Sequence, residues 1–157
     1  PRSFQRLEIH KRRNNLDWLK TFQSAASARG GTAELFTYGN LGTTTTHLPY
    51  EGETRSEDAH PVQISTVALD DLVASGELRT PQFVKLDAEG HGHHALQGML
   101  QTLRNARPVI MIGLHSPQER QGTLSILEPL NYRWETVDDH PEQSEGGALG
   151  DFLFSPR

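Results

Sequence analysis

The sequence predicts an α/β fold with a mainly parallel sheet. Val109 to Leu114 is a continuous apolar run (VIMIGL), as expected for a parallel strand that is buried on both faces. Phe83 to Leu86 forms a second short apolar strand, and between the two the apolar residues from Ala95 to Leu103 recur on one helical face. The order strand, helix, strand indicates βαβ units, whose strands run parallel.

Length and composition limit the functional classes. The chain has 157 residues, which we interpret as one domain over 1–157. It has no cysteine, so disulfides, thiolate metal sites and a cysteine nucleophile are excluded. A net charge of −5 argues against a nonspecific nucleic-acid binder. No apolar run approaches the roughly 20 residues that span a membrane, and no targeting signal opens the chain, so we expect a cytoplasmic location.

The first half of the chain carries shorter signals. Residues 39–57 are polar and contain Gly39, Gly42 and a run of threonines, so we expect a long loop there. The other expected elements are a helix over 3–14, strands over 18–22, 33–38 and 62–66, and a short helix from Leu69 that ends at Gly76.

The second half has clearer boundaries. Ser116 and Glu119 form a capping box with Pro117 at the first helical position, which predicts a helix that starts at this point. We expect a strand over 132–137, a polar loop over 138–150 and a last strand over 151–154.

Reactive side chains follow both apolar strands. Asp87 and Glu89 come directly after the first strand, and His115 comes directly after the second. Ligands bind beyond the carboxyl ends of such strands, where two carboxylates and an imidazole can do acid–base chemistry. The alternative is structural: Asp87 caps the next helix, and His115 only leads the chain out of the sheet.

Three histidines, His91, His93 and His94, follow the first strand. Together with Asp87 and Glu89 they offer metal-ligand chemistry. Their spacing of one and two residues, however, splays side chains around a helix axis. We therefore favour a solvated helix start and predict no metal.

Four segments resemble, in the same order, motifs of the FkbM family of methyltransferases. They match its "TLDDL" segment, its "KIDVEG" strand end, its leucine–glycine helix and its "RPVIxxE" strand: VALDDL (67–72), FVKLDAEGH (83–91), ALQG (95–98) and RPVIMI (107–112). Asn131-Tyr132-Arg133 resembles the "LGY" entry to the next strand. Gly31 to Phe36 and the 42–46 loop resemble the family's "GxxxFY" and "GxSS" segments.

The resemblance implies an S-adenosylmethionine-dependent O-methyltransferase that acts on a hydroxyl of a small metabolite or sugar. It also implies a Rossmann-like class I methyltransferase sheet, with the last strand antiparallel beside Val109–Leu114. The implied catalytic residues are Asp87, Glu89 and His115, with His115 the candidate base because a histidine titrates near neutral pH. The implied contacts are Gln23, Ser24, Ala25 and Asp87 for the cofactor, and Thr43, Thr44 and His91 for the substrate.

Some features of the family are missing. The glycine-rich turn for the methionine part of the cofactor and the acidic residue for its ribose do not occur here. We therefore expect a sheet that is incomplete at its N-terminal side. An upstream segment of the same protein or a homo-oligomer would complete it, and the isolated chain should not bind the cofactor at micromolar concentrations. Gly92 and Gly113 stand where the family often has carboxylates. A noncatalytic interaction or scaffold domain that retains the fold is the alternative function.

Overall fold

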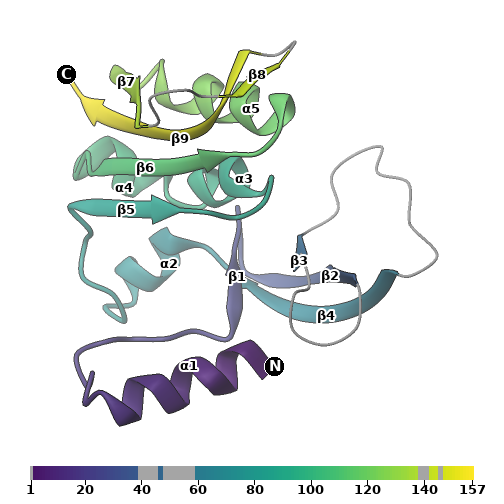
Figure 1. The fold of residues 1–157 in the computed structure, drawn as a ribbon. Coiled ribbons are helices and arrows are strands. Elements are labelled where there is room, and N and C mark those ends of the chain that lie inside the picture. Colours follow the sequence, from purple (N-terminus) through teal and green to yellow (C-terminus); the bar gives the residue numbers. More distant parts are fainter. Residues whose placement is uncertain (1, 39–45, 48–58, 138–141, 145–146) are drawn as a thin grey trace.

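A computed structural model of the chain describes residues 2–38, 46–47, 59–137, 142–144 and 147–157. Figure 1 shows how the elements are arranged. In chain order they are α1 (Arg2–Arg13), β1 (Ser24–Ala26), β2 (Gly31–Tyr38), β3 (Thr46–His47), β4 (Ala59–Val67), α2 (Leu69–Ala74), β5 (Phe83–Leu86), α3 (Gly92–Gln97), α4 (Leu100–Asn105), β6 (Val109–Leu114), α5 (Pro117–Leu127), β7 (Tyr132–Thr136), β8 (Glu142–Ser144) and β9 (Gly147–Pro156).

The main sheet of the described residues has the order β5-β6-β9-β7, and β8 pairs with β9. β5 and β6 are parallel, with Phe83 opposite Val109, which confirms that these strands are neighbours and that β6 is a central strand. β9 runs antiparallel between β6 and β7, as expected for the last strand. β5, β6 and β7 thus share one direction. The expectation of mainly parallel pairing is wrong for this sheet, because β9 separates β6 from β7.

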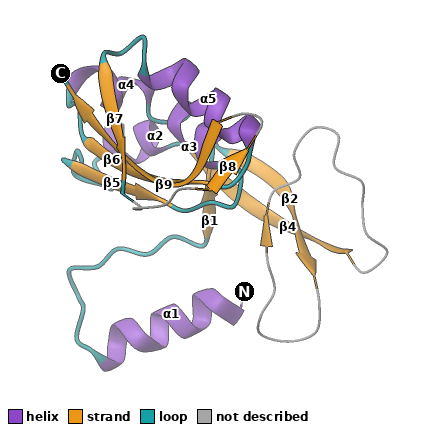
Figure 2. Cartoon of the chain, turned by 45° about the horizontal axis from the view of Figure 1, so that its top comes forward, coloured by secondary structure: helices purple, strands orange, loops and turns teal. Residues whose placement is uncertain are grey.

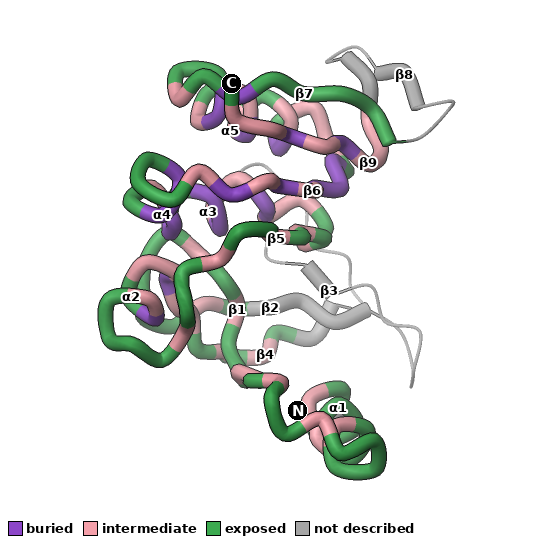
Figure 3. The backbone as a smooth tube through the Cα atoms, turned by 90° about the vertical axis from the view of Figure 1, so that its left-hand side faces the viewer, coloured by how far each residue is buried: buried purple, intermediate pink, exposed green. Residues whose placement is uncertain are grey.

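Helices cover one face of this sheet. Figure 2 shows α3, α4 and α5 on the same side of β5, β6 and β9. Side chains on that face are almost fully buried, and Figure 3 shows burial concentrated there. The core consists of Leu96, Met99, Leu103, Ile110, Ile112, Leu114, Leu127, Tyr132, Phe152 and Phe154.

The opposite face of the sheet is less covered by the described residues. On β5, Val84 and Leu86 pack against the core, whereas Phe83 is 54% exposed and Lys85 is exposed too. Val109 and Met111 of β6 are half-buried. The apolar run of β6 predicted burial on both faces, and its residues reach full burial on the helix-covered face and at Gly113.

A second sheet has the order β1-β4-β2-β3. β2 and β4 form an antiparallel pair, and β1 joins the end of β4 in parallel, with Ser24 opposite Ser65. The predicted strand over 18–22 is wrong. The chain turns after α1, where Asn15 has φ 53°, and pairing with β4 begins only at Ser24, which leaves Trp18 78% exposed.

The loop expected over 39–57 lies mostly outside the described residues. Its described part, Thr46–His47, is the short strand β3, which pairs with β2. In the part of the chain that the structure describes, no helix is both long and apolar enough to cross a membrane.

The helix expected from Ala95 to Leu103 is divided into α3 and α4 at Gly98 and Met99. A Cβ on Gly98 would lie 2.0 Å from the backbone oxygen of Ser27, so the helix contacts the end of β1 without any side chain between them. The Asp70 carboxylate then accepts hydrogen bonds from the N–H groups of Gln101 (2.8 Å) and Thr102 (2.9 Å) and so caps α4. These long-range contacts leave no trace in local periodicity.

Candidate active site

The predicted candidates Asp87, Glu89 and His115 meet at the carboxyl ends of β5 and β6. The parallel register sets Leu86 opposite Ile112, so both strands end at the same edge of the sheet. His115 Nε2 lies 3.1 Å from Asp87 Oδ1, and His115 Nδ1 lies 3.9 Å from Glu89 Oε2. The imidazole is therefore held between two carboxylates.

The three side chains are accessible. The exposed fractions are 37% for His115, 54% for Asp87 and 51% for Glu89. Lys85 Nζ approaches the other oxygen of Asp87 at 4.0 Å. Exposed ion pairs of this kind add at most about 1 kcal/mol to stability, so the cluster is not needed to hold the fold.

Local backbone conformation brings Glu89 towards the imidazole. Glu89 has φ 44° and Gly90 has φ 97°, which form a tight left-handed turn between β5 and α3. The His91 N–H closes this turn on the Ala88 oxygen at 3.0 Å. A non-glycine residue in this conformation costs about 1–3 kcal/mol, and such residues gather at functional sites.

Gly113 gives the imidazole its space. A Cβ at this position would lie 3.0 Å from His115 Nε2, 3.3 Å from Asp151 Oδ1 and 3.4 Å from Asp87 Oδ1. Asp151 lies directly opposite Gly113 in the β6–β9 pair. Asp151 is thus a site residue that the sequence reasoning missed, because the register of an antiparallel neighbour is not visible in the sequence.

Glu119 is the second residue that was missed in this role. Its N–H donates to Ser116 Oγ at 3.1 Å, which confirms the predicted cap. The carboxylate does not complete the capping box: it accepts from the N–H groups of Gly92 at 2.7 Å and His115 at 2.9 Å. It is fully buried, with no exposed surface.

The three histidines after β5 form a contiguous group of rings. Ring centroids lie 4.6 Å apart for His91 and His94 and 4.0 Å apart for His93 and His94. Burial, then the neighbouring His94 and His93, lowers the pKa of His91 to about 4. Burial and His94 also lower the pKa of His93. His91 and His93 are therefore neutral at neutral pH.

Metal-ligand spacing occurs elsewhere among the described residues. Asp87, Glu89 and His115 each offer a donor atom, and these atoms lie within 4.8 Å of one another. The described histidines 91, 93 and 94 do not form such a group. The expectation that the protein binds no metal must therefore be tested at Asp87, Glu89 and His115.

The residues predicted to contact cofactor and substrate have different outcomes. Gln23 precedes β1, and Ser24 and Ala25 lie within it, so the strand end expected at these residues is in fact at Ala26 and Ser27.

The predicted substrate contacts are described in part. His91 Nε2 lies 3.3 Å from Ser27 Oγ, which connects the end of β1 to the candidate site. Thr43 and Thr44 are outside the described residues.

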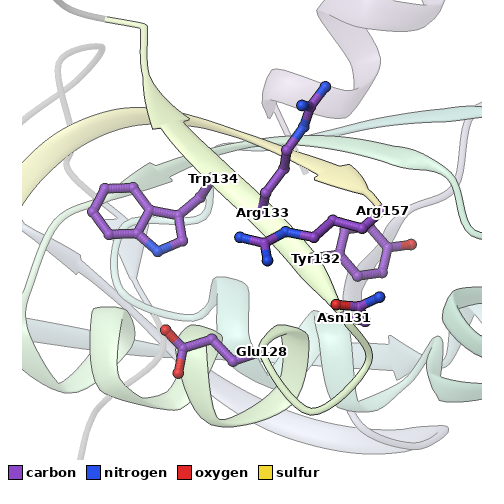
Figure 4. A pocket seen from close by; sticks show the side chains of 6 residues that line it. All are labelled: Glu128, Asn131, Tyr132, Arg133, Trp134 and Arg157. Atoms are coloured by element: carbon purple, nitrogen blue, oxygen red, sulfur yellow. The ribbon is translucent and has the colours of Figure 1, made fainter.

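A cavity of about 310 Å³ lies at the other end of the main sheet (Figure 4). It is open and polar, and it lies where β7 begins and β9 ends. The lining residues are Glu128, Asn131, Tyr132, Arg133, Trp134 and Arg157. In open α/β sheets ligands bind at the carboxyl ends of the parallel strands, so the cluster around His115 is the stronger candidate.

Comparisons with known proteins identify the family and the fold. The sequence model of the Methyltransferase FkbM domain matches residues 7–143. Hexuronic acid methyltransferase AglP of Haloferax volcanii is 36% identical over 64 residues, which are 41% of this chain and 26% of that protein. The fold is similar to the crystal structure of methyltransferase FkbM from Methylobacillus flagellatus KT, with a TM-score of 0.57, 16% identity and coverage of 96% of this chain.

The chain spans about a quarter of the length of the curated relative and 33% of the solved structure. The family match nevertheless covers most of this chain, including β5, β6 and the side chains that meet at their ends. The chain therefore belongs to the FkbM methyltransferase family.

Proposed function

We propose that this chain carries the catalytic strand ends of an S-adenosylmethionine-dependent O-methyltransferase that acts on a hydroxyl of a small metabolite or sugar. The observation that carries the proposal is the imidazole of His115 between Asp87 and Glu89, in a chain of the FkbM methyltransferase family. The similarity to a hexuronic acid methyltransferase supports a sugar-derived acceptor.

His115 is the proposed base. With its Nε2–H donated to Asp87, the neutral imidazole presents Nδ1 as an acceptor beside Glu89. His115 would take the proton of the acceptor hydroxyl at Nδ1 as that hydroxyl is methylated. The Nε2 proton stays on the imidazole, and Asp87 accepts its hydrogen bond and stabilises the imidazolium that forms, as an orienting carboxylate does. Glu89 faces the same nitrogen and accepts a hydrogen bond from a neighbouring substrate hydroxyl.

S-adenosylmethionine, when bound, supplies a methyl group on a sulfonium and leaves as the thioether. The side chains present fit two of its parts. The half-exposed carboxylate of Asp87 can bind an ammonium group. Ser27, at the end of β1, and the neutral His91, whose ring lies against it, offer uncharged polar groups suited to an adenine edge. We therefore propose His91 for the cofactor side and not for the substrate side that the resemblance implied. We propose this strand end, one to two residues beyond Ala25, as the adenine side.

The experiment is a paired measurement on the natural protein that contains this chain. Calorimetric titration with S-adenosylmethionine measures cofactor binding, and transfer of a labelled methyl group to hexuronic acids and neutral sugars measures the reaction. We expect binding together with transfer to a hydroxyl. A protein that does not bind the cofactor would overturn the proposal.

That negative result would favour the alternative of a noncatalytic interaction domain. The observation on its side is the exposed Phe83 on β5, which is at an edge of the sheet formed by the described residues. Exposed apolar strand edges are surfaces on which another chain can pair.

A further inference from the structure

We propose that Glu119 is a positioning residue for methyl transfer: its buried carboxylate fixes the distance between His115 and the turn that carries Asp87 and Glu89. The inference rests on the proposed function, because His115 is the base in both. No side-chain atom of Glu119 has to reach substrate or cofactor for this role.

The carboxylate joins three segments that are separate in the sequence. It belongs to the first turn of α5, it accepts from the His115 N–H at the end of β6, and it accepts from the Gly92 N–H at the start of α3. Gly92 is 27 residues away in the chain. One side chain therefore fastens both strand ends whose residues form the candidate site.

The anchoring is strong for physical reasons. Hydrogen bonds from N–H groups to a carboxylate are charge-assisted, and in a buried place they are not weakened by water. Ser116 caps α5 and accepts from the Glu119 N–H, so the backbone of Glu119 is itself held. A negative charge is also favoured in the first turn of a helix.

The absence of a side chain at Gly92 makes room for the Glu119 carboxylate. A Cβ at position 92 would lie 2.7 Å from Glu119 Oε1 and 2.8 Å from Ile112 Cδ1. Ile112 is a fully buried core residue and has no room to retreat. A side chain at 92 would therefore displace the carboxylate, and the hydrogen bond to the Gly92 N–H would be lost.

The turn between Asp87 and Gly92 depends on this anchor. Glu89 has a positive φ, a conformation that a non-glycine residue keeps only where the surrounding contacts maintain it, whereas Gly90 adopts it freely. If the Glu119 hydrogen bonds are broken, the turn can shift against His115. Displacements of about 1 Å in a catalytic constellation can lower rates by about 10²-fold.

The test compares Glu119→Gln with Asp70→Asn in the natural protein. Asp70 is the control, because its carboxylate also accepts from two backbone N–H groups, at 2.8 and 2.9 Å, but these belong to α4 and not to the strand ends of the candidate site. The measurements are kcat, KM, the midpoint of thermal unfolding and the ¹⁵N chemical shifts of the His115 ring. The ring shifts report the hydrogen bond to Asp87.

We expect Glu119→Gln to lower kcat about 10- to 100-fold with KM nearly unchanged, and to alter the His115 ring shifts. Asp70→Asn should lower the thermal midpoint and leave kcat and the ring shifts as they are. Equal loss of kcat in both variants, or wild-type ring shifts in Glu119→Gln, would overturn the inference.

Two further measurements keep the inference testable. If Glu119→Gln does not fold, Gly92→Ala displaces the same carboxylate, and the same altered ring shifts are expected. If His115→Ala retains full activity, the base role fails. The ring shifts still decide whether Glu119 positions His115, because that measurement does not depend on turnover.

Discussion

The two ends of the main sheet differ in the features that indicate a functional site. At the carboxyl end of β5 and β6, exposed titratable groups face one another, and a buried carboxylate fixes their backbone. At the opposite end there is a cavity, but its surroundings are structural. Arg107 donates to the oxygens of Leu130 and Asn131, and Tyr132 donates to the oxygen of Pro108.

The cavity therefore marks a place where the chain folds back on itself. Arg107 stands over the ring of Tyr132 at 5.4 Å and stabilises the connection into β7. This arginine belongs to the "RPVI" segment. Its contacts are structural and lie at the end of the sheet away from His115. The convergence of reactive groups is the better guide to chemistry than the presence of a cavity.

The largest expected effect tests this contrast directly. His115→Ala and Asp87→Asn should each lower the rate of methyl transfer by about 10²–10⁴-fold, the usual loss when an acid–base group is removed. Arg133→Ala, which alters the lining of the cavity at the other end, should leave the rate within about threefold. Steady-state kinetics and circular dichroism on folded variants check both. A larger loss in Arg133→Ala than in His115→Ala would reverse the assignment of the two ends.

The next effect is the pH dependence of stability that arises from His91, near the carboxyl end of the sheet. The pKa of His91 is lowered from 6.5 to about 4, so the unfolded chain binds this proton more readily than the folded chain. Stability from this group is complete above pH 6.5 and is lost as the pH falls towards 4. Because the ring is partly exposed, we expect a loss on the order of 1–2 kcal/mol in unfolding free energy.

Urea unfolding of wild type and His91→Asn at pH 7 and pH 4.5 measures this difference. The variant should show a smaller drop between the two pH values. The control is His10→Asn in α1, which should behave as wild type does. An identical drop in wild type and His91→Asn would show that other groups cause the acid sensitivity.

The carboxyl end of the sheet also shows which features of the site can be predicted from the sequence. Apolar runs and the βαβ order were sufficient to predict that β5 and β6 are parallel neighbours, and hence that Asp87 and His115 meet. The capping box predicted the start of α5 and the bond from Glu119 N–H to Ser116. These inferences need only local pattern and one rule of topology.

Long-range contacts could not be predicted in this way. The carboxylate of Glu119 binds residues on two other elements, and Gly98 divides a continuous amphipathic pattern because the backbone of Ser27 lies against it. Asp151 joins the site through the register of β9. The segment 18–22 was predicted as a strand because its residue types favour strands. In the described residues no partner strand pairs with it.

A comparable effect on stability is expected at the end with the cavity. Tyr132→Phe removes the hydrogen bond of 3.0 Å to the Pro108 oxygen, which lies in a buried place. The unfolding free energy should fall by about 1–2 kcal/mol, because the carbonyl is left without this donor. Methyl transfer should remain within about twofold. Urea unfolding and kinetics measure the two quantities, and a loss of activity without a loss of stability would contradict the structural role of this end.

The smallest effect is expected from removal of metal ions. Asp87, Glu89 and His115 have the spacing of a metal-binding group, yet His115 Nε2 already lies at hydrogen-bond distance from Asp87, and Lys85 lies near the same carboxylate. A divalent ion would have to replace that hydrogen bond and compete with the lysine.

We therefore expect dialysis against a chelator to leave the rate within about twofold, with the untreated enzyme and the enzyme with added Mg²⁺ or Mn²⁺ as references. Strong inhibition that a divalent ion reverses would make His115 a ligand rather than the base. The His115→Ala variant would then lose metal affinity together with activity, and the carboxyl end of the sheet would be a metal centre.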